Sequence, residues 1–279
     1  MFRVKTMSQD DFDFAVNITD GMEWNLSKAD FEFMVELEPD GCFILFDESK
    51  RIGLATTVDY GPVAWFGNLI IHESYRNKGA GSLLVKHSVE YLTSKNVKTI
   101  GLYAYMDRIH FYETLGFKYD SEFTVLKGKG STQRLNSAVR HAEKQDLREI
   151  MELDSACFGA DRRKLIEPII LDSDNVCYVS VRGERVVGYV AAKVFGKMGE
   201  IGPLVCQKGQ DNVAIGLLSS VLTRLEEYEI LTYVPNKENV VLNYLKTLGF
   251  TESFSVARMF FGTVLNSDCV CMAESLERG

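Results

Sequence analysis

The chain is poor in residues that bind metals and has no long hydrophobic run. Its 279 residues include four histidines, and none of its six cysteines forms a Cys-x-x-Cys pair. Zinc sites usually need closely spaced ligands of this kind, so we expect no metal; Cys269-x-Cys271 is a weak metal or redox hint. No apolar stretch approaches the roughly 18 residues of a transmembrane helix, and the start lacks a secretory signal. We therefore expect a cytoplasmic protein without membrane contact, whose buried cysteines are reduced.

Positive charge is also in short supply. The formal net charge is −8, from 31 basic and 39 acidic residues. A general nucleic-acid binder needs a basic face to neutralise phosphates, so we expect no nucleic-acid partner. The length fits two domains of about 140 residues each, and the 46% hydrophobic content can fill two cores.

One local basic segment stands out against this acidic background. The continuous apolar stretch Ala64–Ile71 is typical of a buried central strand, and a helical pattern begins near Gly79. The first N–H groups of a helix lack internal partners and attract anions. Gly79 and Gly81 let a phosphate approach the backbone, and Arg76 and Lys78 add positive charge. The segment therefore predicts a site for a phosphorylated ligand.

The spacing of this loop narrows the class of ligand. It is Arg-x-x-Gly-x-Gly, which is neither a nucleotide P-loop nor a dinucleotide fingerprint. It resembles the pyrophosphate loop of the GNAT superfamily of acyl-CoA-dependent N-acyltransferases. The resemblance implies acetyl-CoA as cosubstrate, held by Ile70, Ile71, Arg76, Asn77, Lys78, Gly79, Ala80, Gly81 and Ser82. The alternative is an ordinary helix start with two glycines and two solvated cations.

A second segment carries the same resemblance. Phe111–Phe117 is similar to the Phe-Tyr-Glu-Lys-Leu-Gly-Phe segment that ends a late helix of the GNAT fold. There the tyrosine hydroxyl points at the thioester sulfur, which implies that Tyr112 is the general acid that protonates the leaving thiolate. A phenol with a pKa near 10 keeps its proton at neutral pH. The alternative is that Tyr112 only packs in the core.

The resemblance also implies how the acyl group is held. In the GNAT fold the fourth and fifth strands separate, the pantetheine arm pairs with the freed edge, and a backbone N–H there polarises the carbonyl. The family often carries an asparagine shortly before the tyrosine, where this chain has Tyr105–Arg108. Coenzyme contacts at that point are therefore left open.

The second half of the chain repeats the plan of the first. Thr114–Phe117 recurs as Thr247–Phe250, and the strands and helices expected before each come in the same order. We predict a mixed α/β protein with two tandem GNAT-like folds. The predicted divisions are a GNAT domain over 1–128, a linker over 129–136 and a degenerate GNAT-like domain over 137–279.

The second half lacks the features that suit catalysis. The stretch Gly209–Ala214 takes the place of the basic loop but has no arginine, and its Asp211 repels phosphate. Leu245 takes the place of Tyr112. We expect the second domain to cover the acceptor site of the first. The stretch Asp268–Glu277 is expected as a last strand, as a segment in the groove between the domains, or as a frayed tail.

The acceptor side is the least determined part. Trp24 and Asn25, in a loop between two expected helices, and Asp107 are the predicted substrate-binding residues. Glu23, Asp107 or a water chain remain alternatives for the base. We expect transfer of an acetyl group to a primary amine of a small molecule by direct attack, in a monomer or homodimer. A non-catalytic acyl-CoA-binding or sensing module and a peptide N-acetyltransferase are the alternatives.

Overall fold

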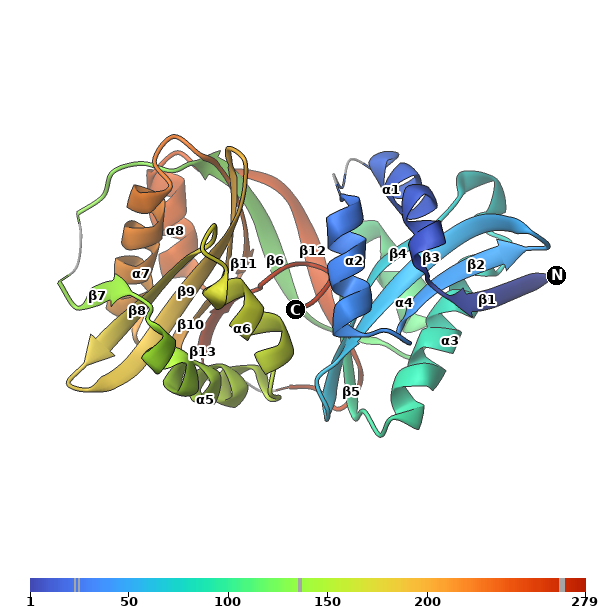
Figure 1. Ribbon diagram of the computed structural model, residues 1–279, viewed down its shortest axis with the longest axis horizontal. Coiled ribbons are helices and arrows are strands. Elements are labelled where there is room, and N and C mark those ends of the chain that lie inside the picture. Colours follow the sequence, from blue (N-terminus) through green and yellow to red (C-terminus); the bar gives the residue numbers. More distant parts are fainter. Residues whose placement is uncertain (23, 25, 135–136, 266–268) are drawn as a thin grey trace.

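The protein was analysed as a computed structural model, which describes residues 1–22, 24, 26–134, 137–265 and 269–279 (Figure 1). The helices are α1 (Phe12–Asp20), α2 (Lys28–Leu37), α3 (Ala80–Ser94), α4 (Ile109–Glu113), α5 (Leu147–Phe158), α6 (Arg163–Leu171), α7 (Asp211–Arg224) and α8 (Asn239–Thr247). Short 3₁₀ turns are η1 (Gln9–Asp11), η2 (Glu73–Tyr75), η3 (Met106–Arg108) and η4 (Lys144–Asp146).

The strands form one mixed sheet. They are β1 (Phe2–Thr6), β2 (Cys42–Asp47), β3 (Lys50–Asp59), β4 (Val63–Ile71), β5 (Thr99–Tyr105), β6 (Lys118–Lys129), β7 (Val139–His141), β8 (Val176–Arg182), β9 (Arg185–Phe195), β10 (Met198–Gln207), β11 (Glu229–Pro235), β12 (Thr251–Gly262) and β13 (Cys269–Met272). The predicted mixed α/β fold is thereby confirmed.

The two halves exchange their last long strands. The sheet order is β1-β2-β3-β4-β5-β12-β6-β11-β10-β9-β8-β7, so β12 of the second half pairs with β5, and β6 of the first half pairs with β11. Strands β6 and β12 also pair with each other and cross the middle of the molecule (Figure 1). Each half is therefore completed by the other, and the division of the chain near residue 128 stays a prediction.

The stretch expected as a linker begins in ordered structure. Lys129 still lies in β6, and Gly130 forms a bridge with Glu226. A Cβ on Gly130 would lie 1.8 Å from the carbonyl oxygen of Leu225, so only glycine permits this approach.

The local sequence determines where helix α2 begins and which of its residues are buried. The side chain of Ser27 accepts from the N–H of Asp30 at 3.4 Å, and the Asp30 carboxylate accepts from the N–H of Ser27 at 2.8 Å. This capping box satisfies N–H groups that the start of the helix would otherwise leave without a partner. Its buried residues Phe31, Met34 and Leu37 then face the core.

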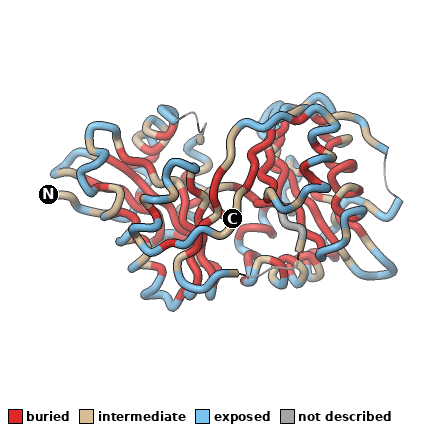
Figure 2. Tube along the Cα trace, turned by 180° about the vertical axis from the view of Figure 1, so that it is seen from behind, coloured by how far each residue is buried: buried red, intermediate tan, exposed pale blue. Residues whose placement is uncertain are grey.

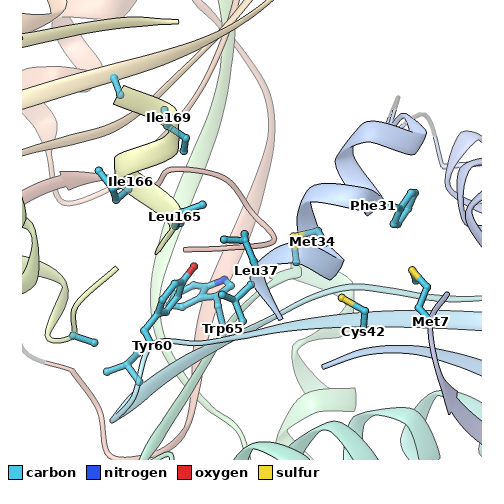
Figure 3. Packing of buried hydrophobic residues seen from close by; sticks show 14 of the residues in the cluster. Met7, Phe31, Met34, Leu37, Cys42, Tyr60, Trp65, Leu165, Ile166 and Ile169 are labelled. Carbon is cyan, nitrogen blue, oxygen red and sulfur yellow. The ribbon is translucent and has the colours of Figure 1, made fainter. Parts of the chain in front are cut away.

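The core on the side of the sheet that α2 and α6 cover contains residues of both halves. Side chains of α2 and α6 converge there, and Leu37, Leu165, Tyr60 and Trp65 belong to the same buried cluster (Figure 3). Buried backbone runs through each half and through the region where they meet (Figure 2). Within the described ranges, the Trp65 indole nitrogen is the sole fully buried side-chain polar atom that lacks a hydrogen-bond partner.

Charged side chains tie the halves together as well. Glu38, at the end of α2, accepts from Lys95 at 2.5 Å and from Lys164 of α6 at 2.9 Å. Burial opposes its ionisation, but these bonds and one from Tyr91 lower the pKa of Glu38 to about 2. A second ion pair, between Arg162 and Asp154 at 2.7 Å, is buried within the second half.

The last segment of the sequence lies between the halves. Strand β13 pairs antiparallel with β10, and the chain then runs to Gly279 at the centre of the molecule (Figure 2). Tyr60 donates to the carbonyl of Arg278 at 2.9 Å, and Arg162 donates to that of Gly279 at 2.5 Å. Of the three expectations for this stretch, a last strand and a segment between the domains both hold, whereas a frayed tail is wrong.

The expectation that the buried cysteines are reduced is wrong for Cys157. Cys157 of α5 forms a disulfide with Cys269, at the start of β13. Cys42, Cys177 and Cys206 are buried thiols, and burial raises the pKa of Cys42 and Cys177 to about 12. Among the helices that the structure describes, none is long and apolar enough to cross a membrane.

Candidate functional site

Strands β4 and β5 separate partway along their length. They pair in parallel from Val63 opposite Thr99 to Trp65 opposite Gly101, and no further, although β4 continues to Ile71. Within the described residues, no strand pairs with β4 beyond Trp65 on that side. The separation leaves a run of β4 backbone facing a gap, as the resemblance implied.

A bulge in β4 lies beside this gap. Leu54 of β3 pairs with Ile70 and Thr56 with Gly67, so two residues, Asn68 and Leu69, oppose one on β3. Asn68 has a φ of 51°, and its side-chain amide donates to the hydroxyl of Thr56 at 3.1 Å. The bulge thus lies in the part of β4 that borders the gap, and the bond from Asn68 to Thr56 ties it to β3. The sequence analysis did not single out Asn68, although asparagine is a common residue at positive φ.

The exposed edge of β4 extends to its end. The N–H of His72 donates to the carbonyl of Ile52 at 2.8 Å, so His72 faces β3 and its neighbour Ile71 faces the gap. The side chain of Arg76 donates from Nε to the carbonyl of Ile71 at 3.0 Å. Ile70 lies two residues before His72, so by the same alternation its N–H points toward β3. Of the two predicted strand residues, Ile71 thus offers its backbone N–H to a ligand in the gap.

The basic loop folds as an anion site requires. Asn77 and Gly79 have φ angles of 60° and 81°, and Gly79 caps the start of α3. Leu83 is the first residue whose N–H bonds back, to the Gly79 carbonyl at 3.0 Å. The preceding N–H groups of Ala80, Gly81 and Ser82 therefore point out of the helix end without an intrahelical acceptor. Arg76, Asn77, Lys78 and Gly79 are exposed around it.

Gly81 connects the loop with the helix that carries the predicted acid. A Cβ at Gly81 would lie 3.4 Å from the Phe111 ring and 3.8 Å from Cγ1 of Ile71. The loop, the end of β4 and α4 thus meet at one place. The structure therefore brings together the predicted pyrophosphate loop and the segment around Tyr112, although Gly81 and Tyr112 are 31 positions apart in the sequence.

Tyr112 is buried among aromatic rings. Its ring centroid lies 5.0 Å from Phe111, 5.8 Å from Phe117 and 6.5 Å from Phe66 of β4. Its hydroxyl makes no hydrogen bond to the described residues. Among these residues, the fully buried side-chain polar atom without a partner is the Trp65 indole nitrogen, not the Tyr112 hydroxyl. The hydroxyl oxygen is therefore not completely buried. Burial raises the pKa of Tyr112, against a small opposing effect of Arg108, so the phenol stays protonated.

The predicted acceptor residues have different surroundings. Trp24 is half-buried and donates from Nε1 to the hydroxyl of Tyr105, at the end of β5, at 3.0 Å. Tyr105 also packs against Phe254 of β12, with ring centroids 5.6 Å apart. Asp107 is exposed and pairs with Arg108 at 3.3 Å. Asn25 and the alternative base Glu23 lie outside the described residues.

The corresponding gap in the second half is filled by the chain itself. Strands β10 and β11 pair from Met198 to Ile201 and then separate. Strand β13 pairs with β10 just beyond, from Leu204 to Gln207, and Ala273 donates its N–H to the Tyr233 carbonyl at 3.2 Å. The edge of β10 that corresponds to the exposed edge of β4 is therefore already paired.

The second half also differs from the first at the helix start that corresponds to α3 and at the position that corresponds to Tyr112. The first turn of α7 carries Asp211, and the residue before it, Gln210, has a φ of −98° rather than the left-handed conformation of Gly79. Leu245 is fully buried in the core of that half. These features leave the first half with the complete arrangement of loop, exposed edge and tyrosine.

Comparison with known proteins agrees with this geometry. The family model described as "Acetyltransferase (GNAT) family" matches residues 5–117, and that described as "Acetyltransferase (GNAT) domain" matches residues 150–269. One relative, GCN5-related N-acetyltransferase 2, chloroplastic, of Arabidopsis thaliana, is 33% identical over 76 residues, which are 27% of this chain. The match spans 30% of that relative's length.

Two solved structures share the fold across nearly the whole chain. A putative acetyltransferase from Pyrococcus horikoshii has a TM-score of 0.85 at 22% identity and covers 100% of this chain and 96% of its own. A tandem GNAT protein from the clavulanic acid biosynthesis pathway has a TM-score of 0.63 at 12% identity, covering 96% and 100%. With the two family matches on the two halves, these likenesses lead to one conclusion: the chain belongs to the GNAT superfamily of acetyltransferases and carries two GNAT domains in tandem.

Proposed function

We propose that the protein is an acetyl-CoA-dependent N-acetyltransferase with one active site, in its first half, and that its acceptor is a primary amine of a small molecule. The observation that carries the proposal is the contrast between the two gaps. The edge of β4 is exposed beside a glycine-rich helix start, whereas the edge of β10 is paired with β13. An extended pantetheine arm can pair with the first edge as an added strand does.

The arrangement assigns a role to each group. The N–H groups of Ala80, Gly81 and Ser82, with Arg76 and Lys78 nearby, bind the pyrophosphate. Backbone N–H groups at the β4 bulge polarise the thioester carbonyl, because donors aimed at the developing oxyanion stabilise it. Tyr112 then gives its proton to the departing thiolate.

The second half has a structural role in this proposal. Its strand β12 pairs with the full length of β5, and its Phe254 packs against Tyr105 on the acceptor side. The second half thereby completes the sheet of the first and closes one wall of the acceptor site. A small amine fits such a closed site better than a large protein substrate.

Binding is tested by thermal shift. Acetyl-CoA should raise the melting temperature of the wild type, and Gly81→Asp should abolish the shift by placing a negative charge at the pyrophosphate. Asn212→Asp is the matched control, because Asn212 is also the second residue of its helix, α7. It should respond as the wild type does. No shift in the wild type at millimolar ligand would contradict the proposal.

Catalysis needs a separate assay. Release of free thiol from acetyl-CoA is followed with a panel of primary amines that includes amino sugars, polyamines, amino acids and short peptides. Turnover with small amines supports the proposal. Binding without turnover across the panel favours a non-catalytic module, and turnover with peptides alone favours a peptide acetyltransferase.

A further inference from the structure

Direct attack by an amine needs a group that accepts its proton, and most carboxylates near the junction of the halves are committed to cations. Glu38 is held by Lys95 and Lys164. Asp107 is exposed and pairs with its neighbour Arg108. These contacts commit the Glu38 carboxylate to two lysines and place the Asp107 carboxylate beside Arg108.

Glu277 lies in a different position, directly against β4. A Cβ on Gly67 would lie 2.6 Å from the Cα and 2.6 Å from the carbonyl oxygen of Glu277. Gly67 is the residue immediately before the bulge residue Asn68. The missing side chain at position 67 therefore makes room for Glu277 next to the point where the thioester carbonyl is proposed to bind.

Gly67 also determines the face of the sheet on which Glu277 lies. Side chains alternate along β4, and Trp65 belongs to the core shared with α2 and α6, whereas Phe66 belongs to the core under α3 and α4. Gly67 shares the face of Trp65. Tyr112 packs with Phe66 on the opposite face. Glu277 and Tyr112 thus lie on opposite faces of β4, the arrangement that a base and an acid for one displacement need.

The surroundings of Glu277 suit a proton acceptor. Its neighbour Glu274 is fully buried and held by Arg278 at 3.0 Å and by a close contact with Lys193. Glu277 keeps 17% of its side chain exposed and pairs with Arg278 at 3.0 Å. It is therefore the more accessible carboxylate of this segment.

The charged groups around Glu277 bear on its proton affinity. Burial raises the pKa of Glu277, as do the carboxylates of Glu200 on β10 and Glu274, whereas Arg278 and Lys193 lower it. Tyr233 of β11 also faces this group. The net result is a pKa above the usual value for glutamate, which brings it closer to the range where an amine loses its proton.

We propose that Glu277, carried from the second half to the β4 bulge by the last segment of the chain, is the base that accepts the proton of the attacking amine. The inference rests on the proposed acetyltransferase function. The amine nitrogen bonds to the thioester carbonyl carbon, and its proton passes to the Glu277 carboxylate. The carbon–sulfur bond breaks, and the thiolate takes the proton of Tyr112. The products are an amide and free coenzyme A, and solvent restores both side chains.

The main test compares Glu277→Gln with the wild type. The substitution keeps the size of the side chain and removes its basicity, so we expect kcat with the best amine of the panel to fall at least 30-fold while the acetyl-CoA thermal shift is retained. In the wild type, protonation of Glu277 should contribute to the fall of kcat/KM toward acid pH. This contribution should be absent from the pH profile of Glu277→Gln. Glu152→Gln is the control, since Glu152 is an exposed carboxylate on α5, and it should keep wild-type kcat.

A second variant tests the placement itself. Gly67→Ala leaves Glu277 intact but puts a methyl group where its backbone lies, so we expect lower kcat with acetyl-CoA binding retained. Glu277→Asp should recover part of the activity that Glu277→Gln loses, because a shorter carboxylate is still a base.

The outcomes separate the two proposals. Suppose that the wild type binds acetyl-CoA and turns over, and that Glu277→Gln keeps kcat within threefold of the wild type with an unchanged pH profile. This result overturns the role of Glu277 and leaves the proposed function intact. A wild type without turnover overturns both. If Glu277→Gln no longer shows the thermal shift with acetyl-CoA, the test rests on Gly67→Ala and Glu277→Asp. Full activity in both of these variants excludes Glu277 as the base.

Discussion

The indole Nε1 of Trp24 donates a hydrogen bond to the hydroxyl oxygen of Tyr105 over 3.0 Å. The bond joins the loop between α1 and α2 to the end of β5, and Tyr105 in turn packs on Phe254 of the second half. Three parts of the chain thus meet where the acceptor is proposed to bind. A change in this contact should affect the acceptor and leave the coenzyme untouched.

Tyr105→Phe removes the hydroxyl and keeps the ring. Because one hydrogen bond contributes about 0.5–1.5 kcal/mol, we expect the KM for the amine to rise roughly two- to tenfold. The KM for acetyl-CoA should stay constant. Steady-state kinetics with each substrate varied in turn measures both. Tyr119→Phe makes the same chemical change on a tyrosine that is 48% exposed, and should have no effect. An equal rise in both KM values would contradict the assignment of Tyr105 to the acceptor side.

Tyr112→Phe tests the general acid. General acid catalysis typically contributes about 10²–10⁴-fold, so we expect kcat to fall by roughly 10² or more while acetyl-CoA still binds. The Tyr112 hydroxyl makes no hydrogen bond to the described residues, so its removal should leave the melting temperature nearly unchanged. Tyr244→Phe is the control in the second half and should keep wild-type kcat.

The pH dependence gives a second test of the same residue. A general acid works while it is protonated, and burial raises the pKa of Tyr112 above the usual value near 10. The decline of kcat at alkaline pH should therefore begin above about pH 10 in the wild type and be absent in Tyr112→Phe. A decline that persists unchanged in the variant belongs to another group.

Much of the first half could be predicted because its signals are local. The apolar run of β4, the two glycines before α3 and the capping box of Ser27 and Asp30 each depend on a few neighbouring residues. The strand exchange could not be predicted in this way. β6 and β12 have similar patterns and pair with each other, so nothing local decides which of them pairs with β5.

The acceptor side was harder to predict for a related reason. Glu277 and Gly67 are 210 positions apart, and their contact depends on where the last segment crosses between the halves. The disulfide between Cys157 and Cys269 also depends on this crossing. Such long-range pairs leave no spacing signal in a single sequence, whereas the Arg-x-x-Gly-x-Gly loop lies within six residues.

The strand exchange predicts that the first half is not independent. A fragment of residues 1–130 loses β12, which covers the edge of β5 from Thr99 to Tyr105, and leaves β6 without either of its partners. Exposed strand edges promote aggregation, so we expect this fragment to be insoluble or aggregated by size-exclusion chromatography. Coexpression with residues 131–279 should restore a soluble complex. A monodisperse, folded fragment 1–130 would show that the halves are separable.

Glu38 links the halves in a way that depends on pH. Its carboxylate accepts from Lys95, Tyr91 and Lys164, and its pKa is about 2, against an ordinary value of 4.5. A carboxyl group that is more acidic in the folded state stabilises that state above its unfolded pKa, and the stabilisation is lost as the pH falls through the folded pKa. Glu38→Gln should therefore lower the free energy of unfolding at pH 7 by up to about 3 kcal/mol.

The difference between wild type and Glu38→Gln should shrink below about pH 4.5 and nearly vanish at about pH 2, because the wild-type carboxyl group is then protonated as well. Urea unfolding at a series of pH values measures it. Glu36→Gln, on the exposed side of the same helix, is the control and should change the free energy of unfolding little at any pH. A difference for Glu38→Gln that stays constant from pH 7 to pH 2 would mean that the shape of this side chain, rather than its charge, joins α2 to α6.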